Sequence, residues 1–135
     1  EQGYIDTESG SSLVTLAADE DFNGTGGITM ADRSYVDATD GNIDVRAARD
    51  ILLANLRTTD HVQVVSRSGA ILDNGDSDLE IQARTAQLLA AQDIGTDANE
   101  LEVDVAFLEG SSTELRCYTD VRFRTQRFQT SKGIL

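Results

Sequence analysis

Residues 41–78 read GNIDVRAARDILLANLRTTDHVQVVSRSGAILDNGDSD, a stretch that contains one apolar pattern twice. Two aliphatic residues at alternate positions are followed by a second apolar run and a polar turn, and the same order then restarts. The matching groups are Ile43 and Val45 with 51–56, then Val62 and Val64 with 70–72. Two structures fit such a stretch: a repeat whose units stack on one another, or two strands that are each followed by an amphipathic helix.

The alternation of apolar and polar residues continues through the rest of the chain. Apolar side chains at every second position are the pattern of a half-buried strand. Seven segments have this pattern: 12–17, 27–31, 42–47, 61–66, 79–84, 101–108 and 115–125. Gly, Asn and Asp dominate the segments between them, and these residues favour turns because they tolerate positive φ or form local side-chain hydrogen bonds.

The spacing of these segments predicts a solenoid. From the first apolar residue of one segment to that of the next, the intervals are 15, 15, 19, 17, 22 and 14 residues. They cluster near the length of one coil in a parallel β-helix, about 20 residues. We therefore predict an all-β protein, a right-handed parallel β-helix of about six short coils. Residues 1–135 would form one solenoid domain, either whole or a segment of a longer repeat protein.

The alternative prediction is a small α/β domain. A helix over 45–59 would have an apolar stripe made of Val45, Ala48, Leu52 and Leu56. Residues 79–93 are rich in Leu, Ala and Gln, which are good helix formers. Asp50 and Asn55 argue against the first helix, because neither residue is favoured in a helix interior. The helical interpretation also leaves the first 40 residues unexplained.

Composition excludes several classes of function. The formal net charge is −13, which opposes sequence-independent binding to nucleic acid and attraction to an anionic membrane. No apolar stretch reaches the ~18 residues needed to span a bilayer. The chain begins at Glu1 without a basic-then-apolar signal segment, so we expect either a mature secreted form or an excised fragment.

Residues 24–108 resemble the repeats of filamentous-haemagglutinin-like adhesins, which are very large bacterial surface proteins. The segment SGAILD (68–73) is similar to the GGAI.D-like turn of that family, and Ile94-Gly95 leading to Asn99-Glu100-Leu101 is similar to its IG...NPL-like turn. Glu100 departs from the family pattern, which favours Pro there. The resemblance implies a β-helical segment of a fibre at the bacterial cell surface.

Two acidic turns are candidate calcium sites. In DEDFNG, Asp19, Asp21 and Asn23 stand at alternate positions before Gly24, a spacing that can turn several oxygens onto one hard cation. The twelfth position of an EF-hand loop would fall on Met30, so only half of that motif is present.

The second acidic turn is DNGDSD. It contains Asp73, Asp76 and Asp78, whose mutual repulsion a bound cation would relieve. Calcium is the cofactor that these groups suggest. A solvated turn is the other interpretation of both segments.

No catalytic arrangement is visible, and we expect no enzyme. His61 is the only histidine and lacks the supporting ligands or orienting acid that a zinc site or a triad requires. Glu102 and Asp104 lie on one strand face and resemble a glycosidase pair in spacing alone. An acidic-groove polysaccharide-degrading enzyme is therefore the weakest alternative.

Charge is distributed unequally along the chain. Residues 1–40 contain nine acidic residues against Arg33 alone, a net charge of −8, whereas 115–135 has a net charge of +4. Sequence order is spatial order along a solenoid, so one end would be acidic and the other basic. The arginines that we expect to contact an acidic partner are Arg116, Arg122, Arg124 and Arg127.

These features lead to one functional prediction. The chain would be a non-enzymatic, extracellular structural or adhesive module that forms homo-oligomers by head-to-tail stacking, since open strand edges and complementary ends favour filaments. A glycan-binding surface module is the alternative. We expect neither nucleic-acid binding nor membrane insertion.

Overall fold

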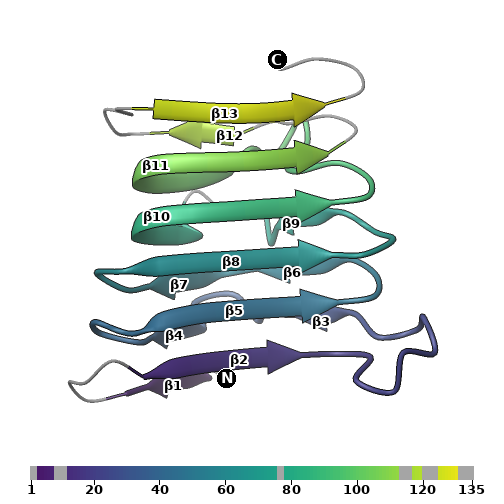
Figure 1. Ribbon diagram of the computed structural model, residues 1–135, viewed down its shortest axis with the longest axis horizontal. Helices are drawn as coiled ribbons and strands as arrows, with labels where there is room; N and C mark the ends of the chain where they lie inside the picture. Colours follow the sequence, from purple (N-terminus) through teal and green to yellow (C-terminus); the bar gives the residue numbers. More distant parts are fainter. Residues whose placement is uncertain (1–2, 8–11, 76–77, 113–116, 120–124, 131–135) are drawn as a thin grey trace.

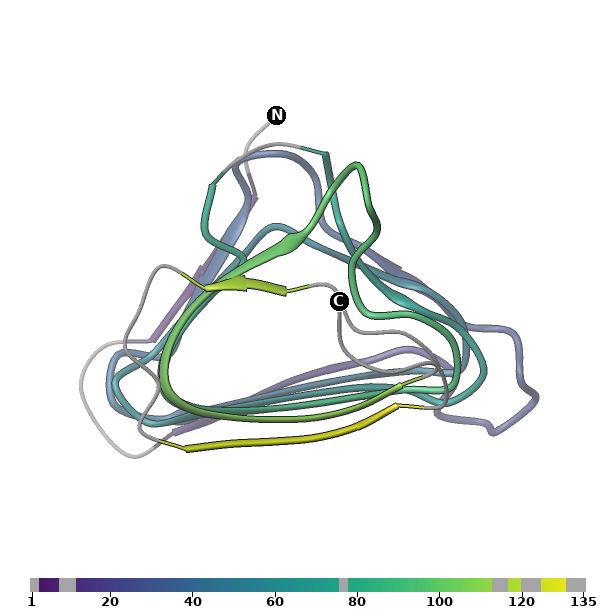
Figure 2. The same ribbon diagram turned by 90° about the horizontal axis from the view of Figure 1, so that it is seen from above.

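The computed structural model describes residues 3–7, 12–75, 78–112, 117–119 and 125–130, the last two segments as backbone. Within these residues every strand pairing is parallel and no helix is present, as expected for an all-β solenoid. Figure 1 shows the strands stacked in sequence order, and Figure 2 shows the triangular outline that the turns share. The all-β prediction is therefore confirmed, and the alternative, a small α/β domain, is wrong.

Each of the first three turns consists of three short strands. The first turn contains β1 (Tyr4–Asp6), β2 (Leu13–Ala17) and β3 (Ile28–Thr29). The second contains β4 (Tyr35–Asp37), β5 (Asn42–Ala47) and β6 (Ile51–Leu53). The third contains β7 (Asn55–Arg57), β8 (His61–Ser66) and β9 (Ile71–Asp73).

The later turns use longer strands that bend around a corner. β10 (Ile81–Ala90) pairs with β7 through its first residues and with β8 through its last, so it serves two sides of the solenoid. β11 (Leu101–Ser112) does the same, pairing with β12 (Cys117–Thr119) and with β13 (Thr125–Thr130).

Three faces result from this pairing. Face A is the stack β2, β5, β8, β10, β11 and β13, and face B is the stack β1, β4, β7, β10, β11 and β12. Face C is shorter and contains β3, β6 and β9, after which Ile71 forms an isolated bridge with Ile94.

The number of turns differs from the prediction. The solenoid has about four turns, whereas the sequence suggested about six coils. Segments 12–17 and 27–31 were counted as separate coils, but they form β2 and β3, which lie on different faces of one turn. A corner between two faces and a return to the same face both look like a polar turn in sequence.

The register confirms that residues 41–78 are a repeat. Ile43 pairs with Val62 and Val45 with Val64 on face A, while Ile51 pairs with Ile71 and Leu52 with Leu72 on face C. The segment proposed as a helix forms β5, β6 and β7 instead. Leu53 points inward and is fully buried, whereas Leu52 is only partly buried, which is the alternation of a strand.

The core consists of columns of aliphatic side chains that run along the solenoid axis. On face A one inward column contains Ile43, Val62, Ala86 and Leu108, all at most 1% exposed. Glycine is required where corners stack closely: a Cβ on Gly69 would lie 2.5 Å from the backbone nitrogen of Asp50 in the turn below. Among the described residues no helix has the length and apolarity needed to cross a bilayer.

Candidate functional site

The first turn of the solenoid has strand edges that are unpaired among the described residues. β1, β2 and β3 form the first turn, and the outer edge of each has no strand partner among the described residues (Figure 1). Four large apolar side chains in the described part of the chain are exposed, and all four belong to this turn. Three of them are on its strands, Tyr4 at 68%, Ile5 at 42% and Leu13 at 64%, and the fourth, Phe22, is in the loop after β2. Ile5 shares a column with Val36, which is only 2% exposed one turn further along.

The aromatic column at this end stops with an uncovered ring. Tyr4 stacks on Tyr35 with ring centroids 5.4 Å apart and an interplanar angle of 13°. The other face of the Tyr4 ring lies toward the end of the stack. The first turn therefore presents the surface that an additional turn would cover.

The acidic loop after β2 is held by contacts within the chain. The carboxylate of Asp19 accepts a hydrogen bond from the Gly24 N–H at 2.9 Å and forms an ion pair with Arg67 at 2.5 Å. Asn23 donates to Asp21 at 2.6 Å and accepts from the Thr25 N–H at 3.0 Å. These contacts occupy oxygens that a cation would use, and calcium binding by this loop stays a prediction.

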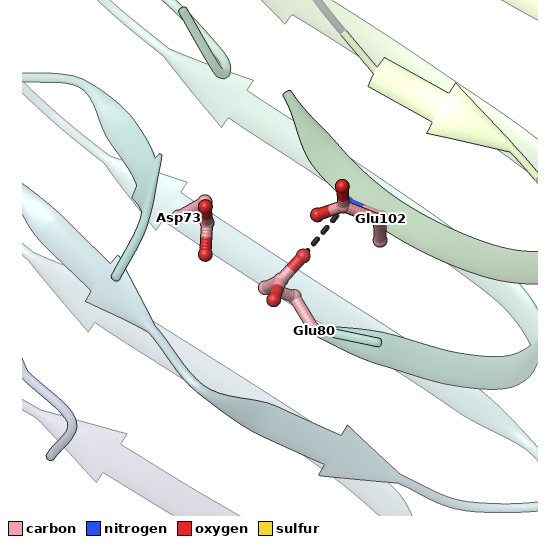
Figure 3. A group of neighbouring side chains, drawn as sticks. All are labelled: Asp73, Glu80 and Glu102. Carbon is pink, nitrogen blue, oxygen red and sulfur yellow. Dashed lines mark hydrogen bonds between the residues drawn. The ribbon is translucent and has the colours of Figure 1, made fainter. Parts of the chain in front are cut away.

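The second acidic turn is described only in part, and calcium binding by it stays a prediction. Asp73, the last residue of β9, is 6% exposed, whereas Asp78 is exposed; Asp76 lies outside the described residues. The side chain of Asp73 instead lies beside two glutamates that the sequence did not single out for this purpose, Glu80 and Glu102 (Figure 3).

These three residues form a carboxylate cluster at the corner between faces C and B. Asp73 ends β9, Glu80 immediately precedes β10, and Glu102 is the second residue of β11. One oxygen from each carboxyl group lies within 4.8 Å of one from each of the others. Both oxygens of Asp73 and Oε1 of Glu80 are buried without a hydrogen-bond partner.

The cluster has an unusual electrostatic environment. Glu80 is 0% exposed, and its Oε2 accepts a hydrogen bond from the Glu102 N–H at 2.7 Å. Burial raises the pKa of Glu80 to about 9; the side chain of Glu102 and the charge on Asp73 act in the same direction, and the Glu102 N–H acts against them. A group with this pKa retains its proton at neutral pH unless a cation replaces that proton.

The sequence singled out Asp73 but not its proximity to Glu80 and Glu102. Glu80 and Glu102 approach each other because Ile81 pairs with Val103, which places the two preceding residues in one column. A usable signal was present in the repeat itself, since ILL (51–53) returns as ILD (71–73) with an acid at a core position.

The predicted basic partner surface is largely outside the described part of the chain. Arg116, Arg122 and Arg124 lie outside the described residues, and Arg127 is placed only as part of the backbone of β13. Contact of these arginines with an acidic partner stays a prediction.

A groove of about 620 Å³ lies on the outer side of face A, next to the loop that follows β2. Thr15, Gln63 and Arg46 line it, together with Phe22 and Arg67. The Arg67 guanidinium lies 4.9 Å from the centre of the Phe22 ring, so a cation–π contact already covers one face of this ring.

The acidic pair considered for catalysis is divided between two sites. Glu102 belongs to the carboxylate cluster, whereas Asp104 lines a hollow of about 670 Å³ with Asp37, Arg57 and Arg84. At Asp37 burial would raise the pKa, but hydrogen bonds from Arg57 and from the Thr39 N–H outweigh it, so the pKa is lowered. A general acid needs the opposite shift. His61, the remaining candidate, has its Nδ1 2.7 Å from Thr85 Oγ1.

No family model matches the chain, and neither a curated protein nor a solved structure matches it.

Proposed function

We propose that this protein is a non-enzymatic structural module that associates end to end through the first turn of its β-solenoid. The observation that carries the proposal is the concentration of exposed apolar side chains on the open turn: Tyr4, Ile5 and Leu13. Open strand edges are templates for pairing with another chain, and here the edge and the apolar side chains coincide.

The energetics favour weak, concentration-dependent association. Full burial of one such side chain contributes about 1.5–3 kcal/mol, and the contribution is smaller here because part of each side chain is already buried in the monomer. Association costs about 4–15 kcal/mol in translational and rotational freedom, so strand hydrogen bonds must supply the remainder. A second copy presenting its last turn would supply both the hydrogen bonds and the apolar cover.

Charge favours contact between unlike ends. The first 40 residues have a net charge of −8 and residues 115–135 a net charge of +4, and the strands stack in sequence order. Two N-terminal ends would repel each other, whereas an N-terminal and a C-terminal end would attract. Head-to-tail contacts of this kind produce filaments when they do not close into a ring.

The resemblance to filamentous-haemagglutinin-like repeats supports the same function. A β-solenoid of about four turns is consistent with a β-helical repeat protein, which is what this resemblance implies. We therefore place the protein outside the cell, at a bacterial surface, as part of this proposal.

Light scattering over a concentration series tests the proposal. We expect the molar mass to rise with concentration and to fall in high salt, because salt screens the attraction between the ends. Leu13→Asp should keep the chain monomeric. Phe22→Asp is the matched control, since Phe22 is 78% exposed but lies on a lateral groove, and this variant should associate as the wild type does.

A monomer at every concentration would contradict end-to-end association. Loss of association in Phe22→Asp alone would contradict it as well and would direct attention to the lateral groove, where the alternative function, glycan binding, would be located.

A further inference from the structure

Asp73 occupies a position in the solenoid core. β9 pairs in register with β6, so Asp73 stands one turn above Leu53 in an inward column. Leu53 is 0% exposed and Asp73 is 6% exposed, yet neither carboxylate oxygen of Asp73 has a hydrogen-bond partner. An ionised carboxylate without a partner is strongly unfavourable in such an environment, so another group must neutralise it.

No basic side chain of the described residues forms an ion pair with Asp73 or Glu80. The ion pairs found among the described residues involve Asp32, Asp44, Asp37, Asp19 and Asp60. Asp73 and Glu80 have no such contact in this part of the chain. The side chain of Glu80 instead faces those of Asp73 and Glu102 (Figure 3), so three acidic groups from three successive turns share one space.

The geometry fits a hard cation. All three groups offer oxygen, which calcium and magnesium prefer to nitrogen or sulfur. Calcium binds oxygens at about 2.3–2.6 Å, so two ligands on opposite sides of the ion are about 4.6–5.2 Å apart. One oxygen from each carboxyl group lies within 4.8 Å of the others, which places all three within reach of one such ion.

We propose that Asp73, Glu80 and Glu102 bind a divalent cation of the size of calcium inside the solenoid. The ion would join the end of β9, the start of β10 and the start of β11, and would thereby connect successive turns of the stack. This site shares only Asp73 with the second acidic turn considered from sequence and no residue with the first, and it is independent of end-to-end association.

Calorimetric titration of the chelator-treated protein with CaCl2 tests the site, together with thermal unfolding in chelator and in about 1 mM CaCl2. We expect one ion per chain and a higher melting temperature in CaCl2, with a smaller shift in MgCl2. Glu80→Gln should weaken binding at least tenfold. Asp73→Leu, which repeats the residue found at Leu53, should abolish binding and should fold in chelator at least as well as the wild type.

Two control variants locate the ion. Asp104→Asn removes an acid from the same strand as Glu102 but outside the cluster, and Asp21→Asn removes one from the loop after β2; both should bind calcium as the wild type does. The absence of binding by the wild type would overturn the proposal, leaving shared protons to neutralise the carboxyl groups. So would unchanged binding by Asp73→Leu, or loss of binding in Asp21→Asn alone. An equal shift in MgCl2 would overturn the assignment of calcium.

Discussion

At the scale of single residues, one difference between two repeats replaces an apolar core side chain with an acidic one. Leu53 and Asp73 occupy successive levels of the same inward column, and the change from leucine to aspartate converts an apolar layer into an acidic centre. Glu80 and Glu102 complete this centre from the next two levels. A solenoid makes such centres possible because identical positions of successive turns lie about 4.8 Å apart.

The ion pair between Asp37 and Arg57 gives a pH-dependent prediction. Hydrogen bonds from Arg57 and from the Thr39 N–H lower the pKa of Asp37 below its ordinary value of 3.8 in spite of burial. The stability that this ionisation contributes is therefore present above pH 3.8 and is lost as the pH falls through the lower, folded-state pKa. For a pair that is partly exposed to solvent we expect about 0.2–1 kcal/mol.

Urea unfolding of wild type and Asp37→Asn, repeated at several pH values, measures this contribution. The wild type should be the more stable protein at neutral pH, and the difference should shrink below pH 3.8. A difference that is the same at all pH values would show that the ionisation of Asp37 has no part in it.

At the scale of the strands, the predicted elements were mostly those that form. Alternation identified β2, β5 and β8 because each has one inward and one outward side. It did not identify the full length of β10 and β11, since the inward positions shift where these strands bend around the corner between faces B and A. The predicted number of turns was wrong because sequence alone does not distinguish a corner between two faces from a complete turn.

The carboxylate cluster could be predicted only in part from the sequence. Asp73 could be recognised as an acid in a turn, and its replacement of a leucine was visible in the repeat. Glu102 follows Asp73 by 29 residues, and the two lie close together only because of the register of the strands. This register cannot be read from the sequence, because the lengths of the turns are irregular.

Adjacent leucines in β6 test the strand alternation directly. Leu53 is fully buried and points inward, whereas Leu52 is partly exposed and pairs with Leu72 on the outer side. We expect Leu53→Ala to lower the free energy of unfolding by about 2–5 kcal/mol and Leu52→Ala to lower it by clearly less. Denaturant unfolding of both variants gives the comparison. A helix over 45–59 would produce the reverse order, because Leu52 and not Leu53 would lie on its apolar stripe.

At the scale of the whole molecule, the stack of turns gives the protein two unlike ends. Interior strands are covered on both edges by neighbouring turns, so stability within the described residues comes from contacts between adjacent levels. The first turn has such a neighbour on one side only among the described strands, and it exposes Tyr4, Ile5 and Leu13. Association between ends would continue the same columns from one molecule into the next, with no new kind of contact.

Head-to-tail association would fix the strand register between two molecules. On face A, Leu13 begins a column that continues through Asn42, His61, Thr85 and Phe107 to Thr125 in β13. The column rests on the pairing of Ile43 with Val62 between β5 and β8. If a second molecule continues the stack, its Leu13 will lie next to Thr125 of the first, at a distance that a disulfide can span.

Oxidative cross-linking in a Cys117→Ser background tests this most directly. We expect a disulfide-linked dimer when Leu13→Cys and Thr125→Cys proteins are mixed, and none when either variant is oxidised alone. Cross-linking of Leu13→Cys with itself, or no cross-link in the mixture at concentrations where the molar mass has risen, would contradict head-to-tail association.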